Sequence, residues 1–322
     1  SYDEKQIDAL RNGDLAGCFG SAFAGLDLQN PPRLPGGRMR LVHRVARIDP
    51  RGGRYGMGLI RAEADIHPDD WFLTCHFVDD MVMPGTLMYE CCLHTLRIYL
   101  LRMGWIGEHD QIAYEPLPGI WSELRCRGPV TPQTRMVTYE VQIKEFGYNP
   151  EPYVIADAFM YSDDKMTVYF KDMALRIAGL SREQIENLLR ERPSPVTPIG
   201  ETVPDLSRKP AVFDTDRILA FAVGNPSEAF GEPYKMFDRD RRMARLPGPP
   251  YSFITRITET NARPWQLESG GWVEAQYDVP PDAWYFRANR QSSMPFSILL
   301  EIGLQTCGFQ AAFMGSALHS DS

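Results

Sequence analysis

The 322-residue sequence predicts an α+β fold in which antiparallel strands wrap one long central helix. The first observation is the stretch 84–104, which carries almost no charge and is apolar around most of its circumference, as a helix buried on nearly all sides would be. The second is that 121–146 and 153–177 alternate apolar and polar positions and are rich in Val, Ile, Tyr, Phe and Thr. Strands of this kind can surround the helix that precedes them.

The segment 70–105 lies at the centre of this organisation. We expect a short strand carrying His76, a tight turn, and then the long helix. Pro84 suits the first helical position, because its missing N–H would have no partner there and its φ is already helical. Gly104 is a suitable stop.

The remaining elements are predicted from the same kinds of pattern. A helix is expected over 5–26, and two strands over 39–48 and 55–66 are joined by a Pro-Arg-Gly-Gly turn. Ser181 can cap a helix over 181–192. The proline-rich stretch 193–210 has no periodicity and is predicted to be an extended linker.

The second half of the chain repeats the first. Residues 39–45 correspond to 251–257, 68–71 to 281–284, and 83–90 to 294–301, with offsets of 212, 213 and 211 residues. Chance similarity would not keep so steady an offset. We therefore predict a first repeat over 1–192, the linker 193–210, and a second repeat over 211–322.

The two copies differ at chemically important positions. Glu90 is matched by Glu301, but no histidine lies between Pro281 and Pro295, where the counterpart of His76 is expected. The first copy also continues for about seventy residues of strands after its helix, and the second copy lacks them. We expect either a longer parent polypeptide or strands supplied by another chain.

Composition excludes several classes of protein. A net charge of −8 argues against a general nucleic-acid binder, which must neutralise phosphates. No apolar run approaches the ~18 residues that span a bilayer, and the N-terminus has no signal pattern, so a soluble cytoplasmic protein with no membrane partner is expected. The six cysteines show no metal or disulfide spacing and are expected to be reduced core thiols.

Two short motifs carry a resemblance to a known family. Cys75-His76-Phe77 and Val82-Met83-Pro84-Gly85 are similar to the active-site segment of hot-dog-fold β-hydroxyacyl-ACP dehydratases. The likeness is to the bacterial dehydratase/isomerase type and to the dehydratase domains of polyunsaturated fatty acid synthases. It implies a double hot-dog, two tandem sheets each wrapped around a helix, with the second repeat incomplete.

The resemblance also implies residue roles for the dehydration of (3R)-hydroxyacyl-ACP to trans-2-enoyl-ACP. In fused double hot dogs, the histidine of one half works with the acid of the other, so His76 is paired with Glu301. Gln305, one turn further along the helix, would orient the acid or the substrate hydroxyl. Gly85 would supply backbone N–H groups at the helix start. The expected substrate-binding residues are Cys75, Phe77, Met83 and Pro84. Glu90 would lie in an inert second site.

Partners follow from the same resemblance. The acyl substrate would arrive on an acyl carrier protein, and no metal or redox cofactor is implied because the phosphopantetheine belongs to the substrate. Other domains of a fatty acid or polyketide synthase are expected partners, and a homodimer is an alternative. The basic run Arg239, Arg241, Arg242 and Arg245 is either a solvated loop or a docking patch for the carrier protein.

Several alternatives stay open. In the bifunctional bacterial enzyme a glycine and a proline stand where this chain has Asp79 and Met81, which leaves double-bond isomerisation undecided. His76 could be an ordinary core histidine, and Glu301 could be a structural acid. A hot-dog thioesterase and a catalytically inactive structural module are the competing functions.

Overall fold

The computed structural model describes residues 1–188, 208–291 and 293–319. Residues 193–207 of the predicted linker and the end of the predicted helix, 189–192, lie outside the described residues. The chain forms two compact units, each built from three segments. Unit 1 comprises Ser1–His67, Leu87–Gly200 and Asp282–Phe296, and unit 2 comprises Pro68–Thr86, Glu201–Pro281 and Ser297–Ser322.

The two units are not separated by a single boundary in the linker. The segment Pro68–Thr86 belongs to unit 2, and the corresponding segment of the second half, Asp282–Phe296, belongs to unit 1. In each half of the sequence, the stretch that precedes the long helix therefore belongs to the unit formed mainly by the other half. The predicted repeat boundaries, 1–192 and 211–322, stay a prediction about sequence rather than a description of the compact units.

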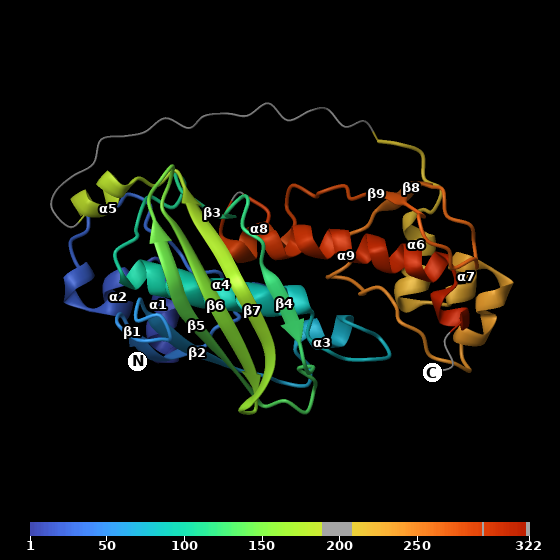
Figure 1. Cartoon of the computed structure of the whole chain (residues 1–322), viewed down its shortest axis with the longest axis horizontal. Helices are drawn as coiled ribbons and strands as arrows, with labels where there is room; N and C mark the ends of the chain where they lie inside the picture. The colour runs from blue at the N-terminus through green and yellow to red at the C-terminus, as the bar shows by residue number, and fades with distance from the viewer. Residues whose placement is uncertain (189–207, 292, 320–322) are drawn as a thin grey trace. The chain divides into compact units, whose positions relative to one another are not determined.

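Unit 1 is built around a seven-stranded antiparallel sheet with the order β1-β2-β5-β6-β7-β3, in which β4 also pairs with β7. Figure 1 shows β5, β6 and β7 as the long strands that cross α4. The strands are β1 (Arg44–Asp49), β2 (Leu59–Asp65), β3 (Ala113–Pro116), β4 (Glu123–Cys126), β5 (Met136–Gly147), β6 (Tyr153–Ser162) and β7 (Lys165–Ala178). The strands expected over 121–146 and 153–177 are thus present.

Helix α4 (Gly85–Arg102) is the predicted central helix, and every residue from Thr86 to Leu101 is buried. Its Tyr89 ring packs against Phe170 of β7 with centroids 5.3 Å apart, and its Tyr99 ring stacks near Phe146 of β5. Burial of such large apolar side chains is the main stabilising term for this arrangement.

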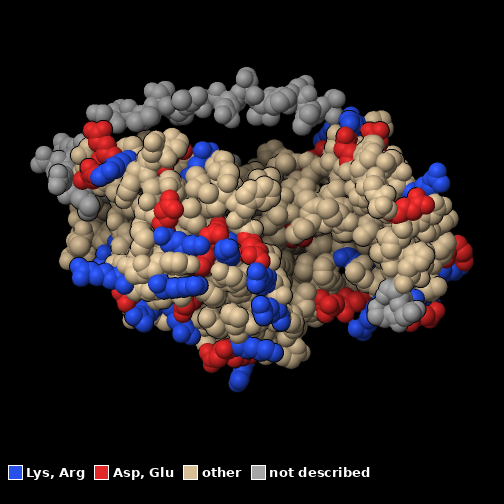
Figure 2. All heavy atoms as spheres, viewed as in Figure 1, with Lys and Arg blue, Asp and Glu red and all other residues tan. Residues whose placement is uncertain are grey.

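The alternation that predicted the strands is interrupted at two points in β7, and one of them follows Phe170. Val168 and Phe170 face inward, and after the irregularity Met173 and Leu175 do so. Asp172 lies at this point with φ of 56°, which marks a β-bulge. The extra residue keeps apolar side chains on the inner face of the sheet. Figure 2 shows basic and acidic side chains next to one another over the long strands. Lys144 and Asp172 form one ion pair of this sheet.

The smaller helices of unit 1 differ from expectation. The single helix predicted over 5–26 is three short ones, because Gly13 has φ of 80° and Asp14 caps a new helix through the Gly17 N–H at 2.7 Å. The helices of this unit besides α4 are α1 (Glu4–Arg11), α2 (Leu15–Phe19), η1 (Ser21–Phe23), η2 (Gly37–Met39), α5 (Arg182–Leu188) and α8 (Trp284–Asn289). Ser181 caps α5 as expected, by accepting the Gln184 N–H.

Unit 2 has a two-stranded sheet and a helical core. Its elements are α3 (Trp71–Cys75), α6 (Thr215–Val223), α7 (Pro226–Phe230), η3 (Glu232–Phe237), β8 (Arg256–Thr260), β9 (Val273–Gln276), α9 (Phe296–Phe313, in this unit from Ser297) and η4 (Ser316–His319). Phe213, Phe221, Phe230 and Phe309 form its apolar centre. Helix α9 begins where the repeat places the counterpart of the start of α4, at 294–301.

Helix α9 is less covered than α4. Leu299 and Leu304 are more than half exposed. Among the described residues, α9 is long and apolar enough to cross a membrane by length and composition, contrary to the expectation that no stretch approaches this limit. The core helix of a soluble protein can have the same length and composition. Helix α9 buries the polar side chains of Glu301 and Gln305. The expectation for cysteines was also wrong in part, because Cys126 and Cys307 are exposed.

Candidate active site

His76 follows directly after helix α3 instead of lying on the predicted strand. The chain then turns tightly, with the Phe77 N–H bonded to the Asp80 carbonyl at 2.7 Å and the Val82 N–H bonded to the His76 carbonyl at 2.8 Å. A helix of five residues is too short to show a helical periodicity, which is why the sequence pattern misassigned it. The turn brings His76 and Val82 together just before α4 begins.

The imidazole of His76 has a defined tautomer in this setting. Its Nδ1 lies 2.9 Å from the Val82 carbonyl oxygen, and a carbonyl can only accept, so Nδ1 carries the proton. In the neutral ring, Nε2 therefore has the free lone pair. Burial lowers the pKa of His76 below its ordinary value, and the Val82 carbonyl and the nearby Glu301 partly oppose that shift. The ring is thus suited to accept a proton near neutral pH.

Glu301 is buried on α9, where two donors hold its carboxyl group. The Thr86 hydroxyl donates to Oε2 at 2.6 Å, and the Gln305 amide donates to Oε1 at 3.0 Å. Thr86 belongs to the first turn of α4, and Gln305 lies one turn after Glu301. The acid is therefore fixed by side chains from both long helices within unit 2.

Gln305 is itself held on both sides of its amide. Its Oε1 accepts the Phe253 N–H at 2.9 Å, and its Nε2 donates to the Tyr251 carbonyl at 2.8 Å as well as to Glu301. These partners determine which end of the amide faces the acid. The predicted neighbourhood of His76, Glu301 and Gln305 in unit 2 is what the structure contains, whereas their catalytic roles stay predictions.

Tyr251 and Thr86 are site residues that sequence reasoning did not identify. The Tyr251 hydroxyl lies 2.9 Å from Thr86 Oγ1, and its ring lies edge-on to His76 with centroids 6.5 Å apart. Tyr251 is fully buried and also packs on Trp71. The sequence contained a weak indication, because Thr86 follows the helix-start glycine and Tyr251 replaces the Met39 of the first copy.

The segment before Tyr251 anchors the backbone at His76. The Gly248 N–H donates to the Cys75 carbonyl at 2.9 Å. A Cβ at Gly248 would lie 2.6 Å from Val223 Cγ1, so a larger residue would push this segment away. Arg245 is largely buried, lies 3.1 Å from the Asp79 carboxylate, and donates to the Gly224 carbonyl. Part of the basic run is therefore structural and not an open docking surface.

A cavity of about 520 Å³ adjoins the His76 turn within unit 2. Phe77, Asp79 and Asp80 form one wall, and residues 242–245 form another. Of the four residues predicted to contact substrate, Phe77 lines this cavity, whereas Cys75, Met83 and Pro84 are buried in the surrounding structure. Gly85 begins α4, as the prediction for a backbone donor requires.

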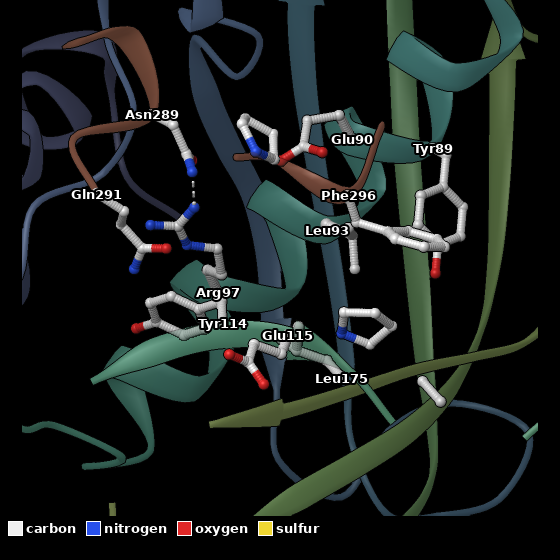
Figure 3. Close-up of a pocket in the computed structure, with 13 residues that line it drawn as sticks. Tyr89, Glu90, Leu93, Arg97, Tyr114, Glu115, Leu175, Asn289, Gln291 and Phe296 are labelled. Atoms are coloured by element: carbon white, nitrogen blue, oxygen red, sulfur yellow. Dashed lines mark hydrogen bonds between the residues drawn. The ribbon is translucent and has the colours of Figure 1, made fainter. Parts of the chain in front are cut away.

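Unit 1 contains a second arrangement of the same construction (Figure 3). By the repeat offsets, Glu90, His94 and Asn289 stand where unit 2 has Glu301, Gln305 and His76. The offset is supported by Thr95 and Thr306, which each bond the carbonyl four residues earlier, at 2.9 and 2.8 Å. Glu90 lies 3.0 Å from His94 Nε2, and both side chains are buried.

Arg97 closes this second arrangement. Figure 3 shows its guanidinium between Asn289, which it contacts at 3.1 Å, and the ring of Tyr114, whose centroid is 4.2 Å away. The matching position in α9 is Gly308. The cavity left here is about 20 Å³, which holds ~1 water molecule. Burial lowers the pKa of Arg97, while Glu90 opposes that shift.

Within residues 1–188, 208–291 and 293–319, no group of three or more His, Cys, Asp or Glu side chains is placed to hold a metal ion. That the protein needs no cofactor stays a prediction.

Comparison with known proteins finds a family likeness in the first half. Residues 34–171 match the model of the FabA-like domain. This part of the chain has the hot-dog fold, with an antiparallel sheet around the long helix α4. The FabA-like match includes His76, Gly85 and Glu90, whereas Glu301 and Gln305 lie outside it.

A relative extends the likeness beyond the FabA-like domain. The chain is 25% identical to a polyunsaturated fatty acid synthase subunit of Thraustochytrium sp. over 434 aligned positions. This alignment covers 99% of the chain and 28% of the relative, so the chain spans about a quarter of that protein.

Solved structures are more distant. The dehydratase heterocomplex ApeI:P from Xenorhabdus doucetiae is 13% identical, with a TM-score of 0.33 over 48% of this chain and 93% of that one. A thioesterase superfamily member from Thermus thermophilus is 14% identical, with a TM-score of 0.28 over 41% of this chain and 88% of that one.

Proposed function

We propose that the chain dehydrates (3R)-hydroxyacyl thioesters carried on an acyl carrier protein to trans-2-enoyl thioesters. The observations that support the proposal are a neutral imidazole with its proton on Nδ1 and a buried carboxyl group in the same unit, which acts electrostatically on that imidazole. The FabA-like match and the likeness to part of a polyunsaturated fatty acid synthase support this choice of reaction.

Elimination of water needs a base and an acid at neighbouring carbons. His76 Nε2 would take the proton at C2. The developing charge on the thioester carbonyl would meet N–H groups in the first turn of α4, where Gly85 lies. Glu301 would give its proton to the C3 hydroxyl, which leaves as water. Solvent then returns the proton from His76 to Glu301 before the next turnover.

The two donors to Glu301 indicate which oxygen carries the acidic proton. Oε1 accepts from the Gln305 amide, so in the acid form the proton sits on Oε2. When that proton leaves, the Thr86 hydroxyl and the Gln305 amide both donate to the carboxylate. The charge formed in the reaction is therefore met by groups already in place.

We propose a single working site in each chain. Unit 1 has Asn289 in place of the base and Arg97 in the space near the acid, and its cavity is too small for an acyl thioester. The proposed partners are the carrier protein, which brings the phosphopantetheine arm, and other domains of a synthase in the cytoplasm. A homodimer is an alternative arrangement.

The deciding experiment is incubation with a (3R)-hydroxyacyl pantetheine thioester. Formation of the 2-enoyl thioester, followed by its ultraviolet absorbance, is the expected result, and hydration of the enoyl product should be catalysed too. Release of free thiol would show the competing thioesterase activity. No turnover in either direction would favour an inactive structural module. Appearance of a 3-enoyl product would add isomerisation to the function.

A further inference from the structure

A second large cavity lies in unit 1 and is lined mainly by basic side chains. Its volume is about 790 Å³, and Arg11, Arg33, Arg287 and Arg290 contribute to its walls together with His109. Asp110 is the acidic residue among its described lining residues. The proposed reaction does not use this cavity. In a chain of net charge −8, such a concentration of arginines requires an explanation.

The backbone leaves room for one of these arginines. Arg290 ends α8 with φ of 56°, and a Cβ at Gly36 would lie 2.9 Å from its Nη2. Glycine therefore lets this guanidinium lie against the loop in its present position. Arg33 lies beside Gly13, where its Nε would be in ordinary contact, at 3.6 Å, with a Cβ.

Asp110 lines the cavity, but two other acidic groups nearby, Asp8 and Glu108, have partners of their own. Arg11 pairs with Asp8 at 2.7 Å, and Glu108 accepts the Gln29 and Asn30 N–H groups at 2.9 and 2.6 Å. In the described part of the chain, no carboxylate lies within ion-pair distance of the other three arginines of the cavity. The sheet of unit 1 is different, because there arginine and lysine side chains have acidic partners, such as Arg176 with Glu115.

The unpaired charges act on one another. Burial lowers the pKa of His109, and Arg33 lowers it further. Burial also lowers the pKa of Arg290, and Arg33 lowers it further. Like charges held together in a concave site favour a bound anion, which would relieve their repulsion. Gln291 adds a buried Nε2 that has no hydrogen-bond partner among the described residues and lines the same cavity.

We propose that this cavity binds a phosphate group. Planar guanidinium groups match phosphate oxygens with paired N–H donors, and an anion with two charges suits several unpaired arginines better than a single carboxylate does. The cavity has room for more than inorganic phosphate, so the group can be free or carried on an organic molecule. The phosphopantetheine arm of a carrier protein is one source, and a free phosphate compound is the other.

Calorimetric titration of the full chain separates these outcomes. The probes are 4′-phosphopantetheine, pantetheine without its phosphate, and inorganic phosphate. We expect phosphopantetheine to bind at least ten times more tightly than pantetheine and to weaken as salt is raised. If inorganic phosphate binds as tightly as phosphopantetheine, the site takes free phosphate. Equal binding of pantetheine and phosphopantetheine, or no binding of any phosphate, would overturn the proposal.

Two variants test whether phosphate binds in this cavity. Arg33 and Arg287 are exposed, so R33A/R287A should fold normally and lower phosphate affinity at least tenfold. R51A removes an exposed arginine from the β1–β2 turn and should bind as the unaltered chain does. Unchanged affinity in R33A/R287A, with an unaltered melting temperature, would place the binding elsewhere. Phosphate affinity is measured without the dehydration reaction, so this experiment tests the phosphate site even if the chain does not catalyse dehydration.

Discussion

The Thr86 hydroxyl donates to Glu301 Oε2 at 2.6 Å, so the first turn of α4 reaches the acid on α9 within unit 2. The Tyr251 hydroxyl lies 2.9 Å from the same Thr86 oxygen, and its ring approaches His76. Thr86 has one proton to give. If it gives that proton to Glu301, it accepts from Tyr251. The acid is therefore linked through Thr86 to the hydroxyl group of a tyrosine whose ring lies beside the base.

Removal of the Thr86 hydroxyl should lower kcat more than it raises KM. We expect T86V to reduce kcat about 10- to 100-fold, since a donor to a forming carboxylate contributes about 1.5–3 kcal/mol. T86S keeps the hydroxyl and should retain most of the activity. Steady-state kinetics on a hydroxyacyl thioester provides the measurement.

The Tyr251 hydroxyl should act through Thr86. We therefore expect Y251F to lower kcat less than T86V does, and the double variant T86V/Y251F to be no slower than T86V alone. Fully additive losses would show that the two hydroxyl groups act separately. Equal activity of T86V and T86S would show that the residue contributes packing only.

The pH dependence should report on His76. Burial holds its pKa below the ordinary value of 6.5, so the base form persists to lower pH than for an exposed histidine. We expect kcat/KM to rise with pH through a pKa below ~6.5 as the base form of His76 accumulates. H76N should remove both the activity and this limb of the profile. A limb above pH 7 would contradict the assignment.

Stability should depend on pH in the same direction through His94. Burial lowers the pKa of His94, so the unfolded chain binds a proton more readily than the folded one. The stability from the neutral ring is present above ~6.5 and is lost as pH falls through the lower folded pKa. H94Q should flatten the melting-temperature profile between pH 5 and 7, about the range of this titration. An unchanged profile would show that His94 contributes little.

The sequence predicted the central elements because their signals are long. The helix after Pro84 and the strands after 121 extend over many residues, and their apolar pattern has one period throughout. The five-residue helix before His76 is shorter than two turns, so its pattern cannot be told from a strand. The 5–26 helix was wrong because Gly13 and Asp14 end one helix and start another.

The candidate site was predicted in part for a similar reason. His76, Glu301 and Gln305 stand at positions that the repeat and the resemblance identify, so their proximity followed from alignment. Thr86 and Tyr251 are joined by a contact across 165 positions, which no local pattern reveals. Arg97 was missed because a single basic residue in an apolar helix suggests a solvent-exposed position, whereas here its side chain is buried and fills the space near Glu90.

Gln305 should be needed for both folding and catalysis. Q305L would leave the Phe253 N–H and the Tyr251 carbonyl without their present partner, at a cost of about 1–3 kcal/mol for each buried group. Q305E keeps an acceptor but loses the donor to Glu301 and adds a second carboxyl beside it. We expect Q305E to fold better than Q305L yet to be at least tenfold slower than the unaltered chain. Chemical denaturation and kinetics test the two effects separately.

The two matched acids should differ in their effect on dehydration. E301Q removes the proposed proton donor and should abolish measurable activity, as should H76F. E90Q is the matched control from the other helix, and its folded fraction should keep an unchanged kcat. If E90Q slows the reaction as strongly as E301Q does, the pairing of His76 with Glu301 is wrong.

Glu90 and Arg97 should instead matter for stability. Both are at least 95% buried, and Glu90 opposes the effect of burial on the pKa of Arg97, so each single removal takes away a favourable interaction of a buried group. We expect E90Q and R97M each to lower the free energy of unfolding by about 1–3 kcal/mol. The double variant E90Q/R97M should lose less than the sum of the two, because no isolated charge remains. Urea denaturation of the four proteins measures this difference, and simple additivity would show that the two residues do not form a charge pair.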